Sequence, residues 1–340
     1  MIKEKLKKLF YRVINNSLFS YISRGHKNNG IILCYHRVLP ENMIDSNNYP
    51  DKSLITSLEN FEKHLEYFSK NYELVSLDEI ITIKDEGRFK ICITFDDGYK
   101  DNLDYVLPLI KKYNIPITIF ITTRFLENDV FLWWYELWEY IQSQKKIIFN
   151  YNKKEFLFKL NSYKDKINCY NALSLLFLNE DSVNNQKKLL KNIGQNNPNF
   201  NFNSLFIKRK NLIELKRDPL VTIGCHSHNH IRFSKLSDKL TRSEIEISTK
   251  ILEKNTNIKI EHFAYPYGQL EDLAIDNLDI LKSFNFKSIS TAINRNIDFN
   301  NTDLINLPRY GISNQDDLNS IMCKINGSHS FIMSNFNAYQ

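Results

Sequence analysis

The sequence predicts an α/β fold, a distorted TIM-like (β/α)7–8 barrel of parallel strands with one helical insertion. Short apolar runs alternate with segments of helical periodicity along most of the chain. No glycine-rich dinucleotide loop follows a strand candidate, which favours a barrel over an open doubly wound sheet. Polar residues directly follow several strand candidates, as expected at the carboxyl rim of such a barrel.

Each strand candidate is a short apolar run, and each helix candidate shows helical spacing or a capping motif. The strand candidates are 31–35, 73–75, 90–95, 116–122, 221–225, 262–265, 287–293 and 304–307. The periodicity predicts helices over 61–68, 101–113 and 271–284. Capping motifs predict two more helices, one opened by Ser76–Glu79 and one opened by Thr241–Glu244 that runs to about residue 254.

The barrel is expected to occupy residues 30–325, and the interval from about 129 to 215 interrupts its rhythm. This interval begins near the Phe-Leu-Trp-Trp-Tyr sequence at 131–135 and continues through lysine- and asparagine-rich helical sequence. Because it shows few strand signals and limited apolar content, we interpret it as a helical insertion and not as a separate domain. Residues 326–340 form the expected C-terminal tail.

Residues 1–29 are predicted to form a basic amphipathic helix, with apolar residues at helical spacing between lysines over 2–22. Two interpretations stay open: peripheral contact of this helix with an anionic membrane surface, or packing on its own domain. Polar residues such as Arg12 and Asn15 break any signal-peptide core, and no apolar run is long enough to span a membrane. We therefore expect a cytoplasmic protein, with association to the inner face of the membrane left open.

The net charge and the cysteine spacing indicate which partners and which compartment to expect. The formal net charge is +6, and the basic residues are spread along the chain, which argues against nucleic-acid binding. The five cysteines form no Cys-x-x-Cys pair, and Cys34, Cys92 and Cys225 lie in strand-like apolar runs. We expect buried thiols in a reducing compartment.

Two groups of polar residues point to a metal. Asp96 and Asp97 follow one buried strand candidate, where adjacent ionised carboxylates repel each other unless a cation compensates them. His226, His228 and His230 follow another strand candidate. Two imidazoles and one carboxylate with open coordination positions suit Zn²⁺, and also Co²⁺, Ni²⁺ or Fe²⁺. The sequence therefore predicts a divalent metal site, most simply a zinc site, at the rim.

Three motifs carry a resemblance to a known family. Thr-Phe-Asp-Asp-Gly at 94–98, His-Ser-x-x-His at 226–230 and Pro-Tyr-Gly at 266–268 resemble, in this order, the motifs of NodB-like polysaccharide deacetylases, carbohydrate esterase family 4. The resemblance covers residues 30–125 and 212–325. It implies the following roles: Asp96 as catalytic base, Asp97, His226 and His230 as metal ligands, the Tyr267 N–H as oxyanion donor, and His228 as a bystander.

The chain departs from the commonest family pattern in two places. Ala264 stands where that pattern has an arginine, and the late Leu-x-His motif that supplies the general acid is missing, since the chain reads Leu-Pro-Arg at 307–309. Tyr35–His36 resembles instead a circularly permuted subgroup, which acts on biofilm polysaccharides and takes its acid histidine from the first strand. The resemblance thus makes His36 the expected acid, and we infer that Arg309 replaces the missing arginine beside the base.

These assignments predict a metal-dependent hydrolase that removes an N-acetyl group from an amino sugar in a polysaccharide or lipid-linked glycan precursor. The lack of a signal sequence favours a cytoplasmic step in the synthesis of a surface polysaccharide. Trp133, Trp134 and Tyr267 are candidates for stacking on sugar rings, unless the two tryptophans belong to the core. Two alternatives stay open: a metal-dependent hydrolase of small amides or cyclic imides on the same fold, and a non-catalytic carbohydrate-binding homologue.

Overall fold

The computed structural model describes residues 11–12, 29–44, 54–83, 89–128, 130–195, 202–274 and 278–329. The strands are β1 (Asn29–Tyr35), β2 (Arg37–Leu39), β3 (Ile55–Ser57), β4 (Glu73–Leu74), β5 (Lys90–Phe95), β6 (Ile117–Ile121), β7 (Lys146–Tyr151), β8 (Lys154–Lys159), β9 (Val221–Cys225), β10 (His262–Ala264), β11 (Ser288–Ser290), β12 (Ile297–Asp298) and β13 (Tyr310–Gly311). The helices are α3 (Leu58–Asn71), α4 (Leu77–Thr82), the π-helix η3 (Asn102–Val106), α5 (Leu107–Tyr113), α6 (Trp133–Ser143), α7 (Tyr163–Phe177), α8 (Val183–Ile193), α9 (Arg209–Arg217), α10 (Asp238–Thr256), α11 (Leu278–Lys282) and α12 (Leu318–Ile325).

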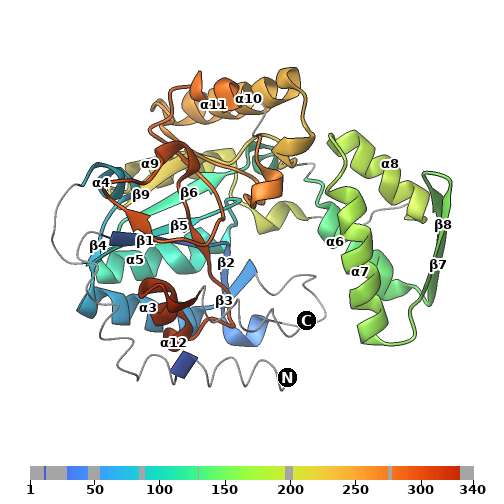
Figure 1. Cartoon of the computed structure of the whole chain (residues 1–340), viewed down its shortest axis with the longest axis horizontal. Helices are drawn as coiled ribbons and strands as arrows, with labels where there is room; N and C mark the ends of the chain where they lie inside the picture. The colour runs from blue at the N-terminus through green and yellow to red at the C-terminus, as the bar shows by residue number, and fades with distance from the viewer. Residues whose placement is uncertain are drawn as a thin grey trace.

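The main sheet curls into a barrel (Figure 1) and is parallel except for β12, which pairs antiparallel with the start of β1. Its strands pair in the order β11-β10-β9-β6-β5-β1. The ring is completed by residues 307–311, because Leu307 bridges to Ser290 of β11 and Tyr310 of β13 pairs with Leu33 of β1. The predicted parallel α/β barrel is therefore confirmed, and a very short last strand closes it.

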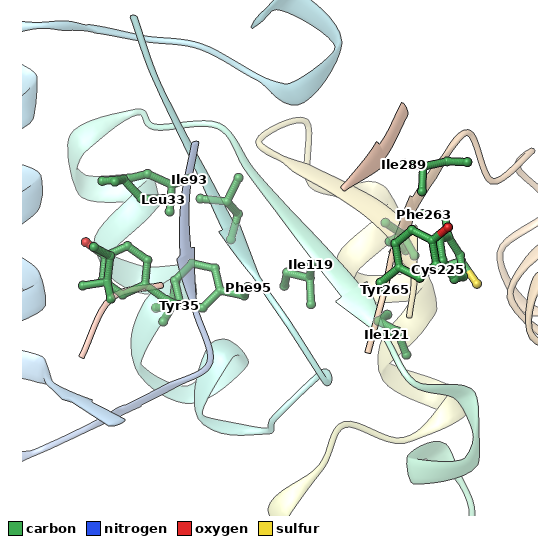
Figure 2. Packing of buried hydrophobic residues seen from close by; sticks show 14 of the residues in the cluster. Leu33, Tyr35, Ile93, Phe95, Ile119, Ile121, Cys225, Phe263, Tyr265 and Ile289 are labelled. Atoms are coloured by element: carbon green, nitrogen blue, oxygen red, sulfur yellow. The ribbon is translucent and has the colours of Figure 1, made fainter. Parts of the chain in front are cut away.

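Side-chain alternation along the strands creates two layers. One set, which includes Leu33 and Ile93, packs against the surrounding helices in the largest hydrophobic cluster (Figure 2). The opposite set, which includes Cys92 and Phe120, forms a separate cluster. Asp96 follows β5 at the parity of Cys92, so the period of two in a strand directs its carboxylate to the barrel interior and not to the helices.

The insertion is mixed α/β and not wholly helical, so that part of the prediction is wrong. Helices α6, α7 and α8 pack with the β7–β8 hairpin around a hydrophobic cluster of their own, and Figure 1 shows the hairpin at the edge farthest from the barrel. Ile147 and Phe149 are buried and alternate with exposed residues along β7. Asn152 and Lys153 both have positive φ, as a two-residue hairpin turn requires. The exposed apolar residues Ile148 and Leu157 interrupt this period-two pattern in the sequence.

The C-terminal limit of the insertion also differs from the prediction. Helix α9 packs against β9 and α10, so residues 209–217 belong to the barrel. The helix predicted over 271–284 is likewise not continuous: a 3-10 turn, η7 (Leu270–Asp272), and α11 are separate elements in its described part.

Two other local predictions are wrong for identifiable reasons. Helix α10 begins one turn earlier than predicted, after Ser237, so Thr241 lies inside the helix and does not cap it. The strand predicted over 304–307 is mainly a 3-10 turn, η9 (Leu304–Asn306), because the Asp303 side chain accepts a hydrogen bond from the Ile305 N–H. The strands predicted at 90–95 and 221–225 and the capping box at Ser76 are confirmed.

Little of the predicted N-terminal helix is described. Tyr11 and Arg12 are helical, and the Tyr11 hydroxyl lies 3.0 Å from Nδ1 of His329. The remainder of residues 1–28, including most of the predicted membrane-contact stretch 2–22, and residues 330–340 of the tail lie outside the described residues. Within the described ranges, no helix is long and apolar enough to cross a membrane. All five cysteines are buried.

The barrel interior predicts one strongly destabilising substitution. A Cβ at Gly224 of β9 would lie 2.4 Å from Cδ1 of Phe120, whose ring is buried. Gly224→Ala should therefore lower the free energy of unfolding by about 1–3 kcal/mol, the usual cost of overpacking a core. Equilibrium denaturation measures this change. The matched control is Gly311→Ala, where nothing lies within 4 Å of the added carbon; equal stability of both variants would contradict the packing argument.

Candidate active site

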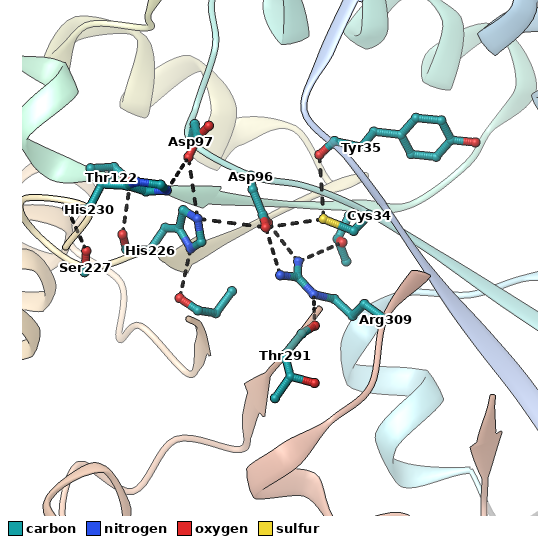
Figure 3. A network of polar contacts seen from close by, with 12 residues as sticks. Cys34, Tyr35, Asp96, Asp97, Thr122, His226, Ser227, His230, Thr291 and Arg309 are labelled. Atoms are coloured by element: carbon teal, nitrogen blue, oxygen red, sulfur yellow. Dashed lines mark hydrogen bonds and ion pairs between the residues drawn. The ribbon is translucent and has the colours of Figure 1, made fainter. Parts of the chain in front are cut away.

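The polar residues singled out in the sequence meet at the carboxyl end of the barrel strands. His36 follows β1, Asp96 and Asp97 follow β5, and the 226–230 segment follows β9. Figure 3 shows Asp96 at the centre of the resulting network. Parallel strands place their carboxyl ends at one edge, so residues far apart in the chain become neighbours.

Asp96 forms a bidentate ion pair with Arg309. The Arg309 Nη1 and Nη2 atoms lie 2.7 and 2.8 Å from the two carboxylate oxygens, and both side chains are almost fully buried (Figure 3). Arg309 is fixed by further donations to the Thr291 carbonyl and to the Thr94 hydroxyl. Burial alone raises the pKa of a carboxyl group, but the Arg309 charge overcomes this and holds the pKa of Asp96 below its usual range. Arg309 thus lies where the prediction required.

Cys34 also contacts Asp96, a contact that was not predicted because Cys34 lies in an apolar run and was assigned to the core. Its Sγ lies 3.3 Å from Asp96 Oδ2. The ligand atoms of Cys34, His36 and Asp96 lie within 4.8 Å of one another. However, burial raises the pKa of the Cys34 thiol well above its usual value, so it is a hydrogen-bond donor and not a thiolate. With Arg309 beside it, this trio is a poor cation site.

Asp97, His226 and His230 form a better metal-ligand set. Asp97 Oδ1 lies 3.5 Å from His226 Nε2 and 3.2 Å from His230 Nε2. All three residues are buried, and one ligand atom of each lies within 4.8 Å of the others. This spacing brings two nitrogens and one oxygen around a common point.

The protonation of these residues fits a divalent cation. Nδ1 of His226 lies 2.8 Å from the Ala264 carbonyl, which makes it the protonated nitrogen and leaves Nε2 free. Burial lowers the pKa of His226 to about 4, so the ring is neutral near pH 7, as a ligand must be. Asp97 Oδ1 is buried and accepts no hydrogen bond among the described residues. A buried carboxylate oxygen without a donor is the atom that a cation would satisfy.

His228 is directed elsewhere, which matches its expected role as a bystander. Its Nδ1 lies 2.9 Å from the Thr123 hydroxyl.

Several site residues adopt a costly backbone conformation. Asp97, Ser227, His230 and Tyr267 all have φ between 57° and 74°. Left-handed backbone at such residues costs roughly 1–3 kcal/mol each and persists only where the surroundings enforce it. The site therefore holds its loops in shapes that the residues would not adopt alone.

Glu244 of α10 enforces the shape of the histidine loop. Its carboxylate accepts hydrogen bonds from the backbone N–H groups of His228 and Asn229 at 3.0 and 2.7 Å, and from the Asn229 side chain at 2.6 Å. The Ser227 hydroxyl accepts from the His230 N–H at 3.1 Å. Glu244 was predicted to belong to a helix cap. Nothing in the sequence distinguishes a capping residue from one that holds a neighbouring loop.

The Pro-Tyr-Gly turn places Tyr267 beside His230, with ring centroids 4.8 Å apart. A Cβ at Gly268 would lie 2.8 Å from the Ala292 backbone nitrogen, so only glycine fits this close approach. Among the described residues, no hydrogen bond engages the Tyr267 backbone N–H. The amide predicted as an oxyanion donor is thus available.

His36 is partly exposed at the same rim. Asn102, the first residue of the π-helix, donates to the His36 carbonyl at 2.9 Å. The Nδ1 atom of His36 is buried and makes no hydrogen bond within the described part of the chain. The predicted acid therefore lies near Asp96 with a ring nitrogen uncommitted.

The sequence of the chain is similar to those of known polysaccharide deacetylases. The sequence profile described as polysaccharide deacetylase matches residues 84–153 and 165–289, more than half of the chain. The poly-β-1,6-N-acetyl-D-glucosamine N-deacetylase of Staphylococcus aureus is 29% identical over 115 residues, an alignment that covers 31% of this chain and 40% of that protein. The Staphylococcus epidermidis protein of the same name is 27% identical over 115 residues. The chain thus matches only about two fifths of the length of these relatives.

Solved structures of deacetylases share the fold. The Streptococcus pyogenes deacetylase PplD in complex with acetate aligns with 87% of this chain and 98% of its own, with a TM-score of 0.54 and 17% identity. IcaB from Ammonifex degensii aligns with 84% of this chain and 92% of its own, with a TM-score of 0.52 and 16% identity. At such identities the likeness establishes the fold alone. Together with the profile match over most of the barrel, it leads to one conclusion: the chain belongs to the polysaccharide deacetylase family.

Proposed function

We propose that the protein is a metal-dependent N-deacetylase that releases acetate from an N-acetylated amino sugar of a glycan. The observation that carries this proposal is the juxtaposition of the Asp97, His226 and His230 ligand set with the Arg309-bound carboxylate of Asp96. The family to which the chain belongs and the names of its staphylococcal relatives support a polymer of N-acetylglucosamine as the substrate class.

Asp97, His226 and His230 would hold the cation, for which Zn²⁺ is the first candidate because nitrogen and oxygen ligands with open positions suit it. When bound, a divalent ion of this kind polarises a carbonyl oxygen and lowers the pKa of water to about 7. The Arg309 charge lowers the pKa of the Asp96 carboxyl group and therefore makes Asp96 a weak base. Such a base accepts a proton efficiently only from an acidified water.

The other residues act on the acetyl group and the leaving amine. Asp96, held in orientation by Arg309, takes the proton of the attacking water. The Tyr267 N–H donates to the oxygen on which negative charge develops. His36 donates a proton to the departing amine, which leaves poorly without one.

The metal ligands are tested by metal content. His226→Ala and His230→Ala should each lose stoichiometric metal, because each removes one of three ligands from a site that cannot replace it. His228→Ala is the matched control and should retain the metal, since its ring nitrogen faces Thr123 and not Asp97. Elemental analysis of the purified variants gives the answer, and an empty site in His228→Ala alone would show that the ligand assignment is wrong.

The base is tested by Asp96→Asn. This variant should bind metal normally yet release acetate at least ~10²-fold more slowly, because the amide cannot accept the proton. It also leaves the buried Arg309 charge unpaired, which destabilises folding by about 3–5 kcal/mol.

Asp96→Asn/Arg309→Met removes that charge and serves as the folding control. Loss of turnover in a double variant that is folded and metal-loaded supports the base assignment. Near wild-type rates in Asp96→Asn would refute it.

The acid is tested by comparing two leaving groups. His36→Ala should leave metal content and folding unchanged but slow acetate release from N-acetylglucosamine oligomers by about 10²-fold. An activated ester such as 4-nitrophenyl acetate should be affected much less, because its leaving group needs little protonation. If His36→Ala hydrolyses both substrates at the wild-type rate, another residue supplies the proton.

A further inference from the structure

The first turn of α6 contacts three different parts of the site with three consecutive aromatic residues. Trp133 donates from Nε1 to the Tyr267 hydroxyl at 3.4 Å. The Trp134 ring centroid lies 5.6 Å from that of His230. The Tyr135 hydroxyl accepts from Nη1 of Arg37, the neighbour of His36, at 3.2 Å. The insertion therefore forms part of the wall of the site.

These three residues differ in burial, which separates their roles. Trp133 and Tyr135 are 5% and 7% exposed, and Trp133 stacks on Phe177 of the insertion's own core, with ring centroids 4.9 Å apart. Trp134 is only half-buried. Its two neighbours thus anchor the turn, while Trp134 keeps part of its ring open to a ligand.

Two half-buried aromatic rings contact His230. The ring centroid of Tyr267 lies 4.8 Å from that of the imidazole, and the ring centroid of Trp134 lies 5.6 Å from it. The Trp134 indole nitrogen is buried and makes no hydrogen bond to any described residue. Because this nitrogen is covered, the exposed part of the Trp134 ring is the part that a ligand can reach.

We infer that Trp134 is a specificity-determining residue that binds the pyranose ring of the acetamido sugar beside the metal ligand His230, and that the insertion exists in part to hold it there. The inference rests on the proposed function and goes beyond it by naming the binding residue. A pyranose ring presents C–H groups that pack on the accessible part of an aromatic ring. Leu137, Trp138 and Ile141 anchor α6 in the core of the insertion, so its folding sets the position of Trp134.

The test measures binding and turnover separately with β-1,6-linked N-acetylglucosamine oligomers. Trp134→Ala should raise KM by about 10-fold with kcat changed much less, since the lost contacts serve binding. Trp134→Phe should recover part of the loss, because it keeps an aromatic ring of smaller area. Both variants should retain stoichiometric metal. The control is Leu175→Ala, a substitution of an exposed apolar residue on α7 of the same insertion, which should match wild type.

Calorimetric binding of the same oligomer to the Asp96→Asn/Arg309→Met protein, with and without Trp134→Ala, removes the dependence on turnover. A roughly 10-fold weaker Kd caused by Trp134→Ala supports the inference, even if wild type releases no acetate and the proposed function falls. An unchanged Kd and KM overturn it. Loss of metal from Trp134→Ala overturns it as well, since Trp134 would then support His230 and not the sugar. If no oligomer binds, both the proposed function and the inference fail.

Discussion

The buried ion pair between Asp96 and Arg309 joins the segment that closes the barrel to the end of β5. Transfer of each charge from water to such an interior costs several kcal/mol, so the pair is tolerable only because its geometry is bidentate and both partners have further hydrogen bonds. Arg309 lies on the segment that bridges β11 and β1, and Asp96 lies at the end of β5. The segment that closes the sheet therefore also orients the candidate base.

The loops around this pair are held by polar groups with no expected chemical role. Glu244 fixes the backbone between His226 and His230. The ion pair between Arg232 and Asp272 joins the histidine loop to the segment after the Pro-Tyr-Gly turn. These contacts compensate for left-handed backbone at four site residues. The site is thus preorganised from α10 and the neighbouring loops, as precise positioning of a ligand set requires.

Much of this architecture could be predicted from the sequence, because strand periodicity is a local property. The strands at 90–95 and 221–225 were predicted with their observed bounds, and the residues after them do meet at one rim. Contacts that depend on tertiary structure could not be predicted. Asp303 converts an apolar run at 304–306 into a 3-10 turn, Glu244 serves a distant loop, and the Cys34 thiol faces a carboxylate. No periodicity carries such information, since each contact joins elements whose separation in the chain is arbitrary.

The position of the closing segment has a consequence for biosynthesis. Arg309 is 213 residues beyond Asp96 in the chain, so nearly the whole barrel is synthesised before the pair can form. Until then the ends of β1 and β11 that residues 307–311 cover present an unpaired edge, while β12 already pairs with Asn29 and Gly30 of β1. Such edges invite pairing with other chains. The nascent protein is therefore most prone to aggregation just before its last strand emerges. Closure of the sheet then covers these edges and orders the site in the same step.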